Sequence, residues 1–172
     1  CNLKRWRDIL KIHFIGGTET VTGSKFLVET DTTRVLIDCG LFQGYKWLRE
    51  KNWQPLLFDI DSLDAVILTH AHLDHSGYLP VLYKLGFRGP VYTHHATKEL
   101  CHILLADSGH IQEEDARYYS RHKLGKHAHP EALYDRKTAD ACMSVFHSIE
   151  FDELITIGDI GFHLQPAGHI LG

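Results

Sequence analysis

Short apolar runs, separated by glycine, proline and polar turns, mark the N-terminal half of the chain. Runs of β-branched and aliphatic residues predict strands, and the Asp-Thr-Thr stretch at 31–33 predicts a hairpin turn between two of them. Residues 81–85 predict a short helix that ends at Gly86. An opening meander followed by alternating strand and helix predicts an α+β fold with α/β-type layers. The predicted strands are residues 11–15, 24–30, 34–38, 64–68 and 90–93.

A helical period replaces this pattern from about residue 96. A further helix is predicted over residues 138–146, so that about 96–147 form a helical insertion. Residues 154–157 and 161–165 predict a hairpin in which His163 faces solvent. Apolar residues on one face of the first helix are expected to be buried, namely Leu100, Ile103, Leu104, Leu105 and Ile111.

The composition of the 172-residue chain is that of a globular domain, and its formal net charge of −4 gives no electrostatic indication of nucleic-acid binding. No apolar run approaches the roughly 20 residues that span a bilayer. Residues 1–10 form a basic extension without the features of a signal peptide, so we expect a cytoplasmic protein that contacts no membrane. The four cysteines show no CxxC pairing. We therefore expect reduced, buried thiols, with Cys39 a packing residue rather than a ligand.

Metal-ligand side chains gather directly after the predicted strand 64–68, where His70, His72, Asp74 and His75 follow in close succession. A strand end is a rigid place from which to position ligands. Imidazole nitrogen and carboxylate oxygen are ligands that zinc accepts. His70 and His72 can converge on one ion, while Asp74 and His75 can face a second.

Two other predicted strands run into side chains of this kind. Asp38 ends the strand 34–38, where a carboxylate either forms a turn or has a functional role. His169 follows Gly168 after the last predicted strand, in the arrangement of a ligand delivered from a neighbouring strand. It can supply the third imidazole for the ion of His70 and His72.

An aromatic segment over residues 41–55 has two interpretations. Its aromatic and basic side chains could stack on bases and contact phosphates. They could instead form a small satellite core beneath a long loop, which is the interpretation we favour. The residues concerned are Phe42, Tyr45, Trp47 and Trp53, with Lys46, Arg49 and Lys51 between them.

Residues 69–75 (THAHLDH) resemble the HxHxDH signature of the metallo-β-lactamase superfamily. Further segments are similar to its β-CASP branch, in particular to bacterial and archaeal RNases related to the cleavage and polyadenylation specificity factor nuclease. The resemblance implies the N-terminal part of a four-layer αββα sandwich, truncated before the β-CASP domain. The segments are residues 19–24 (ETVTGS), 36–44 (LIDCGLFQG), 75–80 (HSGYLP), 107–115 (DSGHIQEED) and 167–172 (AGHILG).

The resemblance also implies a function, which is zinc-dependent hydrolysis of RNA phosphodiester bonds by an endonuclease, a 5′ exonuclease or both. Two zinc ions would acidify a water molecule for attack on phosphorus. His70, His72 and His169 would hold the first ion, and Asp74 with His75 the second. Asp38 would orient the histidine loop and belongs with Asp74 and His75 to the implied catalytic set. The implied partner is single-stranded RNA, and homodimer formation is left open.

The family's bridging Asp, its β-CASP domain and a late histidine have no counterpart up to residue 172. Residues 11–172 are therefore expected to form the N-terminal, incomplete portion of the metallo-β-lactamase domain and to be poorly active alone. Two alternatives remain. One is a hydrolase of a thioester or lactone on the same fold, since this fold hosts many hydrolases. The other is a non-catalytic zinc-binding fragment.

Overall fold

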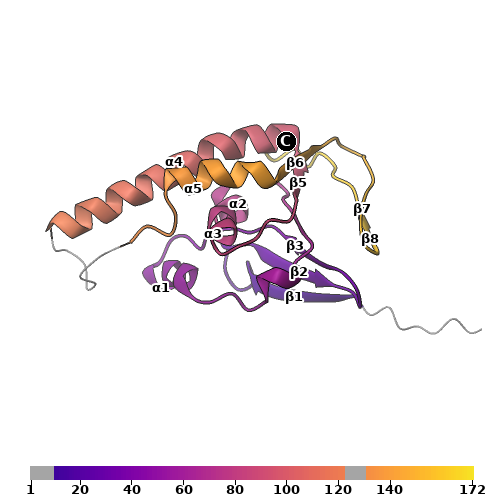
Figure 1. Cartoon of the computed structure of the whole chain (residues 1–172), viewed down its shortest axis with the longest axis horizontal. Helices are drawn as coiled ribbons and strands as arrows, with labels where there is room; N and C mark the ends of the chain where they lie inside the picture. The colour runs from indigo at the N-terminus through magenta and orange to yellow at the C-terminus, as the bar shows by residue number, and fades with distance from the viewer. Residues whose placement is uncertain (1–9, 123–130) are drawn as a thin grey trace, which may run out of the picture.

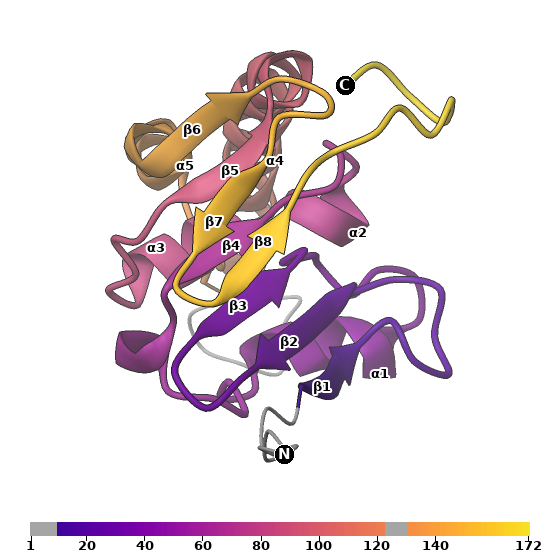
Figure 2. The same cartoon turned by 90° about the vertical axis from the view of Figure 1, so that its right-hand side faces the viewer.

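A six-stranded sheet and a two-stranded hairpin organise the protein (Figures 1 and 2). The computed structural model describes residues 10–122 and 131–172, so the predicted N-terminal extension lies almost wholly outside the described residues. The strand order in the large sheet is β1-β2-β3-β4-β5-β6. Its strands are β1 (Lys11–Gly16), β2 (Lys25–Glu29), β3 (Arg34–Ile37), β4 (Ala65–Ile67), β5 (Val91–His94) and β6 (Phe146–Ile149).

The pairing changes from antiparallel to parallel in the middle of the sheet. β1, β2 and β3 form an antiparallel meander, as the turn signals predict. The strands from β3 to β6 pair in parallel. Their carboxyl ends therefore lie at one edge of the sheet, and the segments that leave this edge can bring side chains together.

Helices cover one face of the sheet, and the hairpin of β7 (Ile155–Ile157) and β8 (Ile160–Phe162) lies against the other (Figure 2). The central strand β4 is consequently buried along its whole length. This is the α/β layer pair, with the start of a second sheet, that the first half of an αββα sandwich requires. The helices are α1 (Lys46–Arg49), α2 (Leu73–Ser76), α3 (Leu79–Lys84), α4 (His95–His122) and α5 (Arg136–Cys142). Three short 3-10 turns are η1 (Glu50–Trp53), η2 (Ile60–Ser62) and η3 (Met143–Val145).

The buried face of α4 agrees with the predicted one only in part, because Leu105 is buried and Leu100 and Leu104 pack against the core. Ile103 and Ile111 are exposed, and the fully buried positions are Thr97, Cys101, Leu105 and Gly109. Small residues face inward because α5 crosses closely: a Cβ added at Gly109 would lie 2.8 Å from the backbone nitrogen of Arg136. Apolar spacing therefore identified Leu105 correctly but placed Ile103 and Ile111 wrongly, because the close packing against α5 depends on small side chains.

The predicted helix 138–146 is also shorter than expected. Asp135 caps α5 by accepting a hydrogen bond from the Thr138 backbone at 2.7 Å, and the helix ends at Cys142. The chain then enters β6, which pairs in parallel with β5 and buries Phe146 and Ile149. Burial against the sheet edge outweighs the local helical pattern, and the sequence interpretation missed this strand.

The aromatic segment is not the satellite core that we favoured. Phe42 is buried, whereas Tyr45, Trp47 and Trp53 are exposed, with 75%, 56% and 57% of their surface accessible. The short α1 and η1 present these side chains outward. By contrast, Cys39, Cys101 and Cys142 are free and buried, so the prediction for the thiols is confirmed for these three. Within the two described ranges, no helix combines the length and apolar character needed to cross a membrane.

Candidate metal centre

The loop between β4 and α2 is held in a compact conformation by hydrogen bonds from the Ser76 side chain. The hydroxyl of Ser76 donates to the carbonyl oxygens of Ala71 at 2.9 Å and His72 at 3.1 Å. Ser76 is fully buried, so these bonds form away from competing water. The turn holds the backbone of the histidine loop before any ligand is present.

The segment after β3 packs directly on this loop. The Cys39 backbone donates to the carbonyl of His75 at 2.7 Å, and the Ser24 backbone donates to that of Asp74 at 2.9 Å. Gly40 lies so close that a Cβ there would sit 1.6 Å from the Asp74 carbonyl oxygen. Glycine at position 40 is therefore a steric requirement for bringing β3 against the loop.

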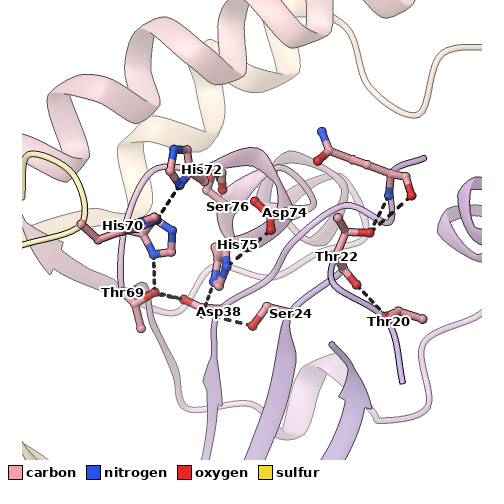
Figure 3. Close-up of polar contacts among 12 residues, drawn as sticks. Thr20, Thr22, Ser24, Asp38, Thr69, His70, His72, Asp74, His75 and Ser76 are labelled. Carbon is pink, nitrogen blue, oxygen red and sulfur yellow. Dashed lines mark hydrogen bonds and ion pairs between the residues drawn. The ribbon is translucent and has the colours of Figure 1, made fainter. Parts of the chain in front are cut away.

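Asp38 connects these segments through its buried carboxylate (Figure 3). Its Oδ1 accepts from the backbone nitrogen of Thr69 at 2.9 Å and from the Thr69 hydroxyl at 2.8 Å. Its Oδ2 accepts from Nδ1 of His75 at 2.7 Å and from the hydroxyl of Ser24 at 3.2 Å. Asp38 has a φ of 58°, a left-handed conformation that aspartate and asparagine tolerate better than most residues. The carboxylate thus orients the histidine loop and does not merely form a turn.

The Thr69 hydroxyl connects Asp38 to the ring of His70 by hydrogen bonds. Because the hydroxyl donates its single proton to Asp38, its oxygen accepts a hydrogen bond from Nδ1 of His70, 2.9 Å away. Nδ1 then carries the imidazole proton, and Nε2 is left with its lone pair. Among the described residues, this Nε2 is one of two buried side-chain polar atoms without a hydrogen-bond partner. An orphaned acceptor of this kind suits a metal ion.

Three imidazoles converge at this point. Nε2 of His169 lies 3.1 Å from Nδ1 of His72. His70, His72 and His169 each offer a ring nitrogen, and these atoms all lie within 4.8 Å of one another. His169 is delivered by a bend rather than by a strand end, because β8 already ends at Phe162. The predicted convergence is therefore present, although the element that delivers His169 differs from the expected one.

Asp74 and His75 lie beside this group. Nε2 of His75 is 3.6 Å from Oδ2 of Asp74, and the His75 ring centroid is 4.1 Å from that of His70. Since Nδ1 of His75 donates to Asp38, its Nε2 is the nitrogen free to bind an ion. The pair therefore faces the space next to the three histidines.

The local environment shifts the pKa values of His70 and His75 in opposite directions. The pKa of His70 lies below its ordinary value, chiefly because burial disfavours the charged ring and also because His75 is close. The pKa of His75 is raised, chiefly by its hydrogen bond to Asp38. A neutral His70 with a defined tautomer is in the form that coordinates a metal.

A cavity of about 480 Å³ opens beside the histidines. The residues that line it include His70, His94, Phe151, His163 and His169. His163 is exposed, as predicted. A substrate group could therefore reach the histidine cluster from this side.

The structure places all of the candidate residues from the sequence in one region. Sequence reasoning missed the roles of Thr69 and Ser24, whose hydroxyls bind Asp38. Both lie within or beside segments already singled out, at 69–75 and 19–24. The sequence offered no direct signal for these contacts, because Ser24 and Thr69 lie 14 and 31 positions from Asp38.

Comparisons with known proteins agree with this geometry. The chain matches the family model of the metallo-beta-lactamase superfamily over residues 20–167. It is 34% identical over 163 residues to the ribonuclease TTHA0252 of Thermus thermophilus, covering 95% of this chain and 33% of that protein. It is 37% identical over 175 residues to the transcription termination factor FttA of Methanothermobacter thermautotrophicus, covering 96% of this chain and 24% of that protein. The chain thus spans a third or less of the length of these relatives.

A solved structure shares the fold. BJP-1, a subclass B3 metallo-beta-lactamase of Bradyrhizobium japonicum, superposes with a TM-score of 0.51 at 17% sequence identity. The match covers 94% of this chain and 53% of that one. The fold class predicted from the sequence is confirmed, and the described residues correspond to about half of such a fold.

Proposed function

The chain belongs to the metallo-beta-lactamase superfamily, and from this premise we propose that it carries the metal-binding portion of a zinc-dependent hydrolase that cleaves RNA. The observation that carries the proposal is the convergence of His70, His72 and His169 within 4.8 Å. The buried, unpartnered Nε2 of His70 supports it, because a polar atom in that position needs a partner.

We assign His70, His72 and His169 to one zinc ion and Asp74 with His75 to a second. Bound ions at these positions supply Lewis acidity and a water molecule with a pKa lowered towards roughly 7. Asp38 is a positioning residue, because it fixes the ring of His75 directly and that of His70 through Thr69. The resemblance to the β-CASP branch implies that a bridging Asp and a further histidine complete this ligand set.

The similarity to two relatives favours RNA as the substrate. A ribonuclease and a transcription termination factor align with nearly the whole chain. The cavity beside the histidines gives a polymer's phosphate a route to the proposed ions. The aromatic side chains exposed on α1 and η1 add surface on which unpaired bases could stack.

Cleavage of a labelled single-stranded RNA by the full-length protein tests this proposal. We expect a chelator to stop cleavage and His70→Ala to reduce it at least about 1,000-fold, or roughly 4 kcal/mol of transition-state stabilisation. His102→Ala, at an exposed position on α4, is the matched control and should retain full activity. Turnover of a thioester without RNA cleavage, or cleavage that survives His70→Ala, would contradict the proposal.

A further inference from the structure

Three large aromatic side chains stand exposed within one short segment. Tyr45, Trp47 and Trp53 lie on and beside α1 and η1, and each has more than half of its surface accessible. Each exposed aromatic side chain forgoes the stabilisation that burial of such a group contributes. A cluster of them in one place marks a contact surface more often than chance exposure does.

Cationic groups lie near the ring of Trp47 and that of the buried Phe42. Nζ of Lys51 is 5.4 Å from the ring centroid of Trp47 and 5.4 Å from that of Phe42. Nζ of Lys25 is 4.9 Å from the same Phe42 ring. Two ammonium groups thus lie near the Phe42 ring, and that of Lys51 also lies near Trp47.

A cavity of about 180 Å³ opens between the two lysines. Lys25 and Lys51 both line it, together with Phe42 and Tyr78, and none of the described residues around it carries a carboxylate. Lys25 is only 3% exposed, and its ammonium group donates to the carbonyl of Gly40 and lies 4.5 Å from the Tyr78 ring centroid. Burial lowers the pKa of Lys25, so an anion in the cavity would stabilise its charged form.

We infer that this surface binds single-stranded RNA, with a phosphate in the cavity between Lys25 and Lys51 and a base stacked on Trp47. The inference rests on the proposed function and extends it by assigning a contact region for the substrate outside the metal centre. The surface, which we call the stacking surface, consists of Tyr45, Trp47, Lys51, Trp53 and the cavity at Lys25.

RNA suits this surface better than a protein partner does. Aromatic and arginine side chains also anchor protein interfaces, but a cavity lined by two ammonium groups and no acid favours an anionic group. Single-stranded RNA supplies both a base that can stack on the exposed rings and a phosphate that can enter the cavity.

Binding of a fluorescent single-stranded oligonucleotide to the metal-depleted full-length protein tests the inference without requiring catalysis. We expect Trp47→Ala to weaken binding about tenfold. We expect Lys51→Gln to weaken it by a smaller factor and to reduce the salt dependence by about one counterion. Tyr118→Ala, an exposed aromatic position on α4, is the matched control and should leave the affinity unchanged. A duplex of the same sequence should bind more weakly, because its bases are not free to stack.

Unchanged oligonucleotide affinity in both Trp47→Ala and Lys51→Gln would overturn the inference and leave a protein contact as the role of the surface. Inaccessibility of Trp47 and Trp53 to acrylamide in the full-length protein would overturn it as well. Either result would leave the proposed function intact if His70→Ala still abolished cleavage. Slower cleavage of a long RNA by Trp47→Ala at low RNA concentration, with a raised KM and an unchanged kcat, would support the stacking surface.

Discussion

Replacing Asp38 by asparagine is expected to lower the zinc affinity of the full-length protein about 10- to 100-fold, with a matching loss of RNA cleavage. The carboxylate accepts four hydrogen bonds, from Thr69 twice, from Ser24 and from His75. The amide nitrogen of asparagine would replace one of the two carboxylate oxygens, each of which accepts hydrogen bonds from two donors. A donor would then face donors. The loop would lose the bonds that set the tautomers of His70 and His75.

Asparagine is the informative substitution because it tolerates the left-handed backbone of Asp38. Alanine at this position would combine backbone strain with the lost bonds. Zinc affinity is measured by competition with a chromophoric chelator. Asp107→Asn, at an exposed position on α4, provides the control for the charge change. Equal zinc affinity in Asp38→Asn and in the unaltered protein would show that the carboxylate does not position the ligands.

Replacing Gly40 by alanine is expected to destabilise the protein by about 3 kcal/mol or more and to remove zinc binding. The added Cβ would lie 1.6 Å from the carbonyl oxygen of Asp74, 2.1 Å from its carbonyl carbon and 2.6 Å from the backbone nitrogen of His75. All three atoms belong to the backbone, so no side-chain rotation can relieve the overlap. The segment after β3 would have to separate from the histidine loop.

Thermal unfolding followed by circular dichroism, together with the zinc content, measures this effect. Gly161→Ala is the matched control, because the only atom near its added Cβ is Cδ1 of Leu154 at 3.7 Å, an ordinary contact. That variant should unfold close to the temperature of the unaltered protein. Unfolding of Gly40→Ala at the same temperature, with full zinc content, would contradict the described packing of β3 on the loop.

The sequence predicted the elements whose signals are local. The strands around Val28, Leu36 and Val66 are continuous apolar runs bounded by turns, and the structure confirms them. The histidine loop was predictable because four ligand-type residues follow a strand end so closely that packing alone does not account for them. The superfamily predicted from the same residues is confirmed.

The predictions that were wrong or missing concern features that depend on contacts between distant segments. The burial of Cys101 and Gly109 in place of Ile103 follows from the close crossing of α5, which no periodicity reveals. The strand at Phe146 forms because β5 offers a free edge. The four bonds to Asp38 come from two separate stretches of chain, Ser24 and the segment 69–75, so the strand-end carboxylate alone could not reveal them.

The zinc content of the full-length protein tests the central assignment most directly. His169 lies 97 positions after His72 in the chain, yet its Nε2 approaches Nδ1 of His72 to 3.1 Å. We expect His169→Ala to lose at least one zinc ion per chain, while His163→Ala, an exposed residue on the same cavity, retains the full content. Full zinc content in His169→Ala, measured by mass spectrometry after dialysis, would show that the three histidines do not share an ion.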